Sequence, residues 1–228
     1  MVGGGSYPQP GEISLAHNGV LFLDELPEYK RTVLEVMRQP LEDRKVTISR
    51  AKFAVDFPTS FMLVAAMNPC PCGYYNHPDK NCSCTKNTVK KYLNKISGPL
   101  LDRIDIHLEV VPVAHQELIM EQNAEASEKI RKRVIAARIL QTNRFQRETA
   151  TNCNAQMNSK ELRTYCKLDE TGKQLIQRAM HQLGLSARAY DRILKVSRTI
   201  ADLAQETNIT SSHLAEAIQY RNLDRSGW

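Results

Sequence analysis

Val20-Leu21-Phe22-Leu23-Asp24-Glu25 is the stretch that decides the fold, because four apolar residues run without interruption into two acids. A short unbroken apolar run is typical of a strand that is buried on both faces of a parallel sheet. We therefore predict an α/β domain in which Asp24 and Glu25 lie at the carboxyl edge of the sheet, where open α/β folds bind ligands. A solvated acidic turn after an ordinary strand would give the same letters, so this stretch alone decides no function.

A second apolar run of this type, 61–66, is followed closely by Asn68-Pro69. Neighbouring parallel strands finish at the same edge, so we expect the amide of Asn68 beside the carboxylates of Asp24 and Glu25. A nucleotide hydrolase needs one carboxylate for Mg²⁺ and another to orient and deprotonate the attacking water, and an amide can hydrogen-bond that water or the γ-phosphate. Asn before Pro is also an ordinary turn former, and taken alone Asn68 would be read that way.

Hydrophobic periodicity changes near residue 113 and predicts two domains, residues 1–113 and residues 114–228. The second domain is expected to be entirely helical. Its helical stripes lie at 115–147, at 175–183 before Gly184, at 193–203 after a Ser186 cap, and at 214–218 after a Ser211 or Ser212 cap.

Two further β features are expected in the first domain. Apolar residues alternate over 46–57, which predicts a hairpin whose basic tip carries Arg50 and Lys52. The segment 104–113 is a candidate third strand, shorter and more polar than the other two.

The composition is that of a globular protein with excess positive charge: 31 Lys and Arg against 25 Asp and Glu give a net charge of +6. This balance favours polyanionic partners, although simple solubility explains it equally well. The basic run 129–147 is open to the same two interpretations, a solvated helix face or a nucleic-acid contact. No apolar run approaches the roughly 20 residues of a membrane span, so a cytoplasmic location without membrane contact is expected.

Four of the six cysteines form two C-x-C pairs within one short segment: Cys70, Cys72, Cys82 and Cys84. Four soft ligands at this spacing suit a tetrahedral, structural Zn²⁺ site, and His77 lies inside the same loop. Free thiols and a redox disulfide are the alternatives in a cytoplasmic protein. Cys153 and Cys166 lie far away and are interpreted as ordinary helical-domain cysteines.

Four motifs occur in order along the chain: GEISLAHNGVLFLDELP (11–27), AAMNPCPCG (65–73), SGPLLDRID (97–105) and LSARAY (185–190). Together they closely resemble the Mg-chelatase-like AAA+ ATPases of the ComM/YifB group. The resemblance covers nearly the whole chain. It implies part of an AAA+ P-loop core, a parallel sheet with helices, followed by an all-α lid domain.

The resemblance also implies a divided nucleotide site that binds ATP and Mg²⁺. Asp24 and Glu25 match the Walker B pair, with Asp24 for Mg²⁺ and Glu25 as the catalytic base, and Asn68 matches sensor 1. Arg103 is placed like the arginine finger that reaches the ATP of the next subunit, and Arg188 matches sensor 2 on the lid. Without the family, surface salt bridges would be the favoured interpretation of both arginines.

The sequence departs from the family pattern at one point, because no stretch reads G-x-x-x-x-G-K-[ST]. We therefore expect the chain to represent the carboxyl-terminal part of the motor and to bind ATP poorly by itself. The resemblance implies, as the leading hypothesis, part of a hexameric, ATP-driven motor that acts on DNA in branch migration, with the basic patches meeting phosphates. The alternatives are a chelatase-type motor subunit that serves a porphyrin-binding partner, and a non-catalytic, zinc-stabilised interaction module.

Overall fold

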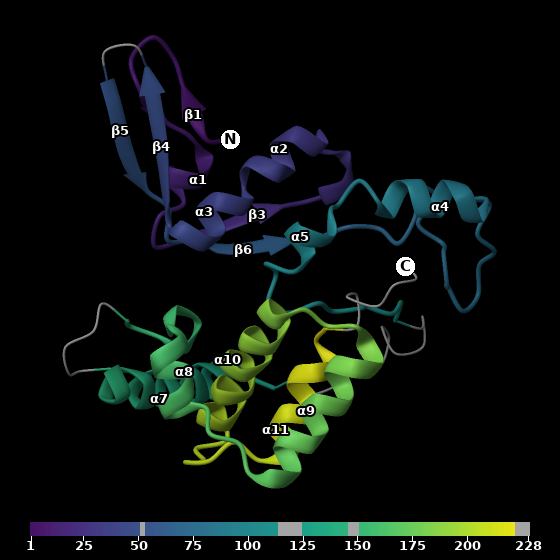
Figure 1. The fold of residues 1–228 in the computed structure, drawn as a ribbon. Helices are drawn as coiled ribbons and strands as arrows, with labels where there is room; N and C mark the ends of the chain where they lie inside the picture. Colours follow the sequence, from purple (N-terminus) through teal and green to yellow (C-terminus); the bar gives the residue numbers. More distant parts are fainter. Residues whose placement is uncertain (51–52, 114–124, 146–150, 222–228) are drawn as a thin grey trace. The chain divides into compact units, whose positions relative to one another are not determined.

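The computed structural model describes residues 1–50, 53–113, 125–145 and 151–221, and these residues fall into two compact units that divide after Ile104. The fold is mixed α/β in the first unit and helical in the second (Figure 1). This is consistent with part of an AAA+ core followed by a helical lid, as the sequence predicted. The predicted domain boundary at 113 borders residues 114–124, which lie outside the described residues, so it stays a prediction.

The central strands of the first unit are β3 (Val20–Leu23) and β6 (Met62–Ala65), and they pair in parallel with Leu23 opposite Ala65. Both predicted strands and their parallel arrangement are therefore confirmed (Figure 1). Burial on both faces is wrong, because Phe22 is 57% exposed and Met62 is 59% exposed. Within the described residues, helices cover one face of this two-stranded sheet only, so alternate side chains reach solvent.

The covered face packs on the core of the first unit. This core contains Ile13, Leu23, Leu26, Leu34, Met37, Ile96 and Leu100. Four of them lie on α1 (Glu12–Leu15), η1 (Leu26–Glu28), α2 (Arg31–Val36) and α5 (Gly98–Leu101), and Leu23 lies on β3. Burial of this apolar surface fixes the strand pair against the helices.

The predicted hairpin is confirmed as β4 (Lys45–Arg50) paired antiparallel with β5 (Phe53–Pro58). Helix α3 (Arg38–Asp43) leads into it and ends at Arg44 in the left-handed region. Two short strands, β1 (Gly3–Gly4) and β2 (Gln9–Pro10), pair close to the hairpin, and Arg50 donates to the Gly5 carbonyl at 2.8 Å. The tip residue Lys52 lies outside the described residues.

The candidate third strand at 104–113 is wrong, because its described backbone joins no sheet. Its polar groups meet helices of the second unit instead. The His107 N–H donates to the Tyr220 carbonyl at 2.8 Å, and Asp105 pairs with Arg192. Because this segment makes its contacts with helices, its described backbone pairs with no neighbouring strand.

The described residues of the second unit form helices α7 (Ser127–Phe145), α8 (Ser159–Tyr165), α9 (Glu170–Leu183), α10 (Ala187–Leu203) and α11 (Ser211–Gln219), with a short turn η2 (Asn154–Gln156). Gly184 ends α9 in the left-handed conformation and Ser186 caps α10 through the Ala189 N–H, as predicted. The predicted cap of α11 is wrong, because Thr210 occupies that position. Among the described helices, none is long and apolar enough to cross a bilayer.

Candidate functional site

The carboxyl ends of β3 and β6 stay joined beyond the last paired residues. The Ala66 N–H donates to the Leu23 carbonyl at 2.9 Å, and the Leu26 N–H donates back to the Ala66 carbonyl at 3.0 Å. Asp24 and Glu25 are thus tied to the segment that leads directly into Asn68. All three polar residues are exposed, so this sheet edge offers two carboxylates and an amide to solvent.

Glu25 has a backbone conformation that is unusual for a residue with a side chain, with φ 49° and ψ 46°. The left-handed region costs about 1 kcal/mol for such a residue. Two contacts hold the turn, because the Glu25 N–H donates to the Asp24 carboxylate at 2.8 Å and the Glu28 N–H donates to the Glu25 carbonyl at 2.7 Å. The chain therefore turns sharply at the second acid, as η1 begins.

The donor chemistry of this edge fits Mg²⁺. Magnesium prefers hard oxygen ligands and keeps several of its waters, so it is bound through one or two carboxylates rather than a closed cage. Asp24 and Glu25 supply exposed carboxylate oxygens, and Asn68 adds an amide that can hydrogen-bond a water or phosphate. The edge can therefore hold a hydrated Mg²⁺ that is shared with a phosphate group.

Arg103 does not lie at the surface, as an arginine finger would, but is only 8% exposed. Its guanidinium donates to the carbonyls of Pro99, at 2.5 Å, and Arg38, at 3.1 Å, and pairs with Glu42 at 2.8 Å. These contacts link α5 to α3 inside the first unit. The structure thus gives Arg103 a stabilising role in its own chain, and a role at a neighbouring ATP would require this side chain to exchange partners.

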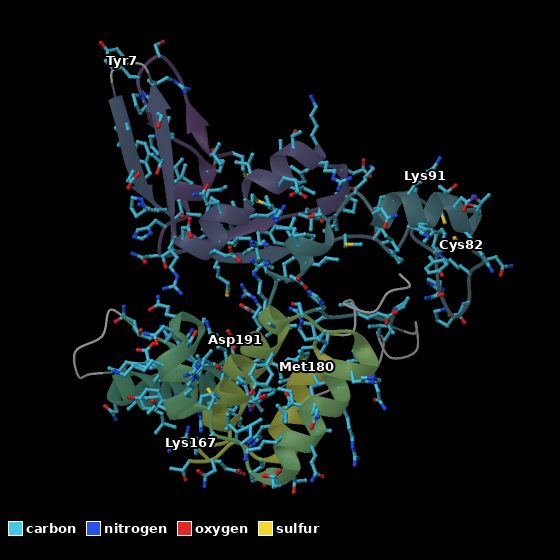
Figure 2. The ribbon with its side chains drawn as sticks, viewed as in Figure 1. Tyr7, Cys82, Lys91, Lys167, Met180 and Asp191 are labelled. Atoms are coloured by element: carbon cyan, nitrogen blue, oxygen red, sulfur yellow. The ribbon has the colours of Figure 1, made fainter. Side chains whose placement is uncertain are left out.

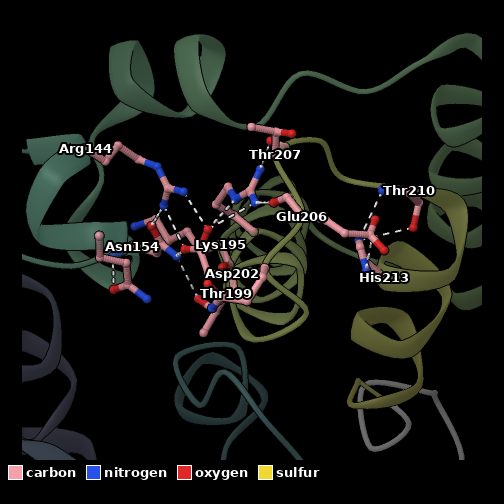
Figure 3. Close-up of polar contacts among 12 residues, drawn as sticks. Arg144, Asn154, Lys195, Thr199, Asp202, Glu206, Thr207, Thr210 and His213 are labelled. Atoms are coloured by element: carbon pink, nitrogen blue, oxygen red, sulfur yellow. Dashed lines mark hydrogen bonds and ion pairs between the residues drawn. The ribbon is translucent and has the colours of Figure 1, made fainter. Parts of the chain in front are cut away.

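Arg188 lies in the first turn of α10 in the second unit, and it is exposed. A buried polar network fixes the other end of this helix (Figure 3). Asp202 is 0% exposed and accepts from Arg144 at 2.5 and 2.8 Å, from Arg198 at 3.1 Å, and from Asn154 at 2.8 Å. This network joins α10, α7 and η2, and it sets the position of the helix that carries Arg188.

Sequence reasoning did not find the network around Asp202. A spacing of four residues places Arg198 and Asp202 on the same side of a helix, but it does not show whether the pair is buried. Arg144 lies 58 residues away from its partner and was included in the predicted basic run. Only the tertiary structure shows that this charge is neutralised inside the unit.

Other cations of the predicted basic surface on α7 form ion pairs at the surface. Lys132 pairs with Glu128 at 2.8 Å, and Arg133 pairs with Glu125 at 3.1 Å. The exposed cations along the described part of this run include Lys129, Arg131 and Arg138. A basic surface that the sequence analysis missed lies on α4 (Lys86–Leu93), where Lys86, Lys90 and Lys91 are exposed.

The four loop cysteines come together as the sequence predicted. Their Sγ atoms lie within 4.8 Å of one another, with 3.3 Å between Cys70 and Cys72 and 3.5 Å between Cys72 and Cys82. A hydrogen bond from the Tyr74 backbone lowers the pKa of the Cys72 thiol to about 5. The cluster is chemically compatible with Zn²⁺. One of its members, Cys82, is labelled in Figure 2. His77 is not among the residues whose ligand atoms come together, and its Nδ1 accepts from the N–H groups of Asp79 and Lys80.

Comparison with known proteins gives matches along most of the chain. The profile of the family described as "Magnesium chelatase, subunit ChlI" matches residues 1–118, and that described as "Magnesium chelatase, subunit ChlI C-terminal" matches residues 124–221. The "Competence protein ComM" of Haemophilus influenzae is 48% identical over 99% of this chain and 43% of its own length. The "Uncharacterized protein YifB" of Escherichia coli is 46% identical over the same shares of both chains.

A more distant relative is the "DNA replication licensing factor mcm6" of Dictyostelium discoideum. It is 23% identical over 92% of this chain and 24% of its own length. The chain thus spans less than half the length of these curated relatives.

Proposed function

This chain belongs to the magnesium chelatase subunit ChlI family, and from that membership we propose that it forms part of an ATP-driven AAA+ motor that acts on DNA. The observation that carries the proposal is the parallel pairing of β3 with β6. This pairing joins the end that bears Asp24 and Glu25 to the segment that bears Asn68. An acidic pair beside a polar amide at the carboxyl edge of a parallel sheet is the arrangement that nucleotide hydrolysis needs.

Each residue of this edge has a separate proposed role. Asp24 would hold Mg²⁺, which when bound neutralises charge on the phosphates. Glu25 would orient the attacking water and accept its proton. Asn68 would hydrogen-bond that water or the γ-phosphate, and so distinguish ATP from ADP.

The two arginines complete the proposal in an oligomer, a hexameric ring. Arg103 would act on the ATP of the adjacent subunit, after leaving Glu42 and its two carbonyl partners. Arg188 would contact the γ-phosphate from the first turn of α10, whose position the Asp202 network fixes. Guanidinium groups suit both roles because they neutralise the charge that develops in phosphoryl transfer.

DNA is favoured over a porphyrin-binding partner by two observations. The name of one relative, a DNA replication licensing factor, refers to DNA, and that of another refers to competence. The chain also has a net charge of +6, with exposed cations on α7 and α4 that can meet phosphates. A chelatase-type motor that serves a porphyrin-binding partner is the second candidate, because the family is described as a magnesium chelatase subunit.

The nucleotide site is tested with Mn²⁺ as a paramagnetic probe for Mg²⁺. We expect this chain to bind Mn²⁺–ATP weakly, and we expect Asp24→Asn to abolish the binding. Asp43→Asn is the matched control, because Asp43 is an exposed carboxylate at the end of α3 and does not belong to the β3–β6 edge. Equal Mn²⁺–ATP binding by all three proteins would refute the assignment. ATP hydrolysis should stay at the buffer background, and a rate that disappears in Glu25→Gln would contradict this expectation.

The DNA role is tested by the fluorescence anisotropy of labelled duplex and four-way-junction DNA over a range of salt concentrations. The triple variant K129Q/R131Q/R138Q should bind DNA more weakly. The slope of the logarithm of the binding constant against the logarithm of the salt concentration should be smaller in magnitude, by about one for each phosphate that the protein no longer neutralises. Lys173→Gln is the control, because it removes an exposed cation from another helix of the same unit. Absence of salt-dependent DNA binding, together with binding to a porphyrin-binding chelatase subunit, would favour the second candidate.

A further inference from the structure

We propose that Cys70, Cys72, Cys82 and Cys84 bind one structural Zn²⁺ that folds the loop 70–84 and fixes its two ends, the carboxyl end of β6 and the start of α4. The inference does not depend on the motor function proposed above.

The sulfur geometry matches a tetrahedral tetrathiolate site. With Zn–S bonds of about 2.3 Å, the edges of the tetrahedron are about 3.8 Å long. The observed Sγ separations of 3.3 Å for Cys70–Cys72, 3.7 Å for Cys70–Cys82 and 3.5 Å for Cys72–Cys82 are close to that value. They are far longer than the roughly 2.05 Å of a disulfide bond, and all four cysteines are free thiols. Small shifts of the side chains would accommodate one ion.

Backbone groups hydrogen-bond to two of the four sulfurs. The backbones of Tyr74 and Ser83 hydrogen-bond to Cys72, and the backbone of Cys84 hydrogen-bonds to Cys82. N–H groups aimed at sulfur are the outer-shell contacts that orient thiolate ligands and disperse their charge. Gly73 supplies the tight turn after the first C-x-C pair, since its φ of +81° is in the left-handed region.

The other contacts within the loop are local, between residues 70 and 80. Residues 70–84 contain neither helix nor strand, and the local core contains only Cys70, Val89, Tyr92 and Leu93, with partly buried neighbours that include the other three cysteines. A metal that joins residues 70 and 84 would therefore supply most of the order of this segment. The first ligand lies two residues after Asn68, and the last directly precedes Thr85, whose side chain caps α4. One ion would thus fix both the end of β6 and the start of a basic helix.

The proposal is tested by measuring the metal content of chain purified without chelators and without added zinc. We expect one Zn²⁺ per chain in the wild type, and at least a tenfold lower content in Cys82→Ser. Cys153→Ser is the matched control, because it removes a partly buried cysteine in the second unit and should keep full zinc content. Equal zinc content in wild type and Cys82→Ser, or none in wild type, would overturn the proposal.

Two measurements on the wild-type chain keep the test decisive if Cys82→Ser fails to fold. Replacement of the metal by Co²⁺ should give the intense visible bands of tetrahedral cobalt thiolate, and octahedral spectra would contradict the site. Removal of the metal with a chelator should speed tryptic cleavage after the exposed Lys80 by on the order of tenfold or more. Unchanged cleavage would refute a structural role. Because none of these measurements involves nucleotide or DNA, their failure is distinguishable from failure of the motor proposal.

Discussion

Asp202→Asn is the substitution that most directly tests how the helical unit is held together. Asp202 is fully buried and accepts hydrogen bonds from Arg144, Arg198 and Asn154, so both carboxylate oxygens are used (Figure 3). An amide keeps one acceptor oxygen, and whichever way it is turned, its NH₂ group faces donors. Two arginines, whose side chains are 14% and 3% exposed, would lose the only charge that both contact in this network.

The expected loss of unfolding free energy is about 3–5 kcal/mol, the usual cost of removing one partner from a buried ion pair. A domain of this size is stable by about 5–15 kcal/mol, so the change is a large fraction of the total. The expected fall in Tm is about 10 °C or more. Far-UV circular dichroism is a suitable assay, because the long helices α7, α9 and α10 belong to the second unit.

Asp191→Asn is the matched control, since it makes the same change near the start of the same helix at a partly exposed position (Figure 2). Its expected effect is within about 0.5 kcal/mol. The double variant R144Q/D202N should be less destabilised than the sum of the single changes, because the two side chains interact directly. A loss below about 1 kcal/mol in Asp202→Asn would refute the idea that this network fixes α10.

Three further predictions concern single side chains. Arg103→Ala should lower the unfolding free energy of the first unit by about 2–3 kcal/mol in urea denaturation, because it removes charge-assisted hydrogen bonds. Arg188→Ala, the control, should leave the unfolding free energy of that unit unchanged. Equal effects of the two substitutions would contradict the buried role of Arg103. In thermal unfolding, the Glu25→Gly variant should be at least as stable as the Glu25→Ala variant, because glycine relieves the strain of the left-handed backbone conformation. This relief should offset the greater entropy of glycine in the unfolded chain. A clearly less stable glycine variant would argue against strain at residue 25. Burial raises the pKa of the Cys166 thiol from 9.0 to about 12, so iodoacetamide at pH 8 should label Cys153 at least tenfold faster than Cys166, as measured by mass spectrometry. The contribution of Cys166 to stability is complete below pH 9 and should be lost as the pH rises from about 9 to 12. Comparable labelling of both thiols would refute this prediction.

Much of the fold follows from local sequence patterns. The strands at 20–23 and 61–66, the hairpin at 46–57 and the caps at Gly184 and Ser186 are all confirmed, because each depends on residues that are close together in the chain. The four cysteines also assemble as expected, since their spacing leaves the short loop little choice. Two of the errors share one cause. The third strand at 104–113 and the two-sided burial of the sheet both required a neighbouring element that the pattern could not supply.

The sequence by itself determined the kinds of elements, the polar residues that end the two parallel strands, and the family to which the chain belongs, because periodicity, turn chemistry and motifs are local properties. Only the tertiary structure decided which charges are buried. Arg103 meets the Arg38 carbonyl 65 residues away, and Arg144 meets Asp202 across 58 residues. The role of an arginine depends on the partners that folding brings to it, and the energy of those contacts comes from desolvation that no linear pattern records.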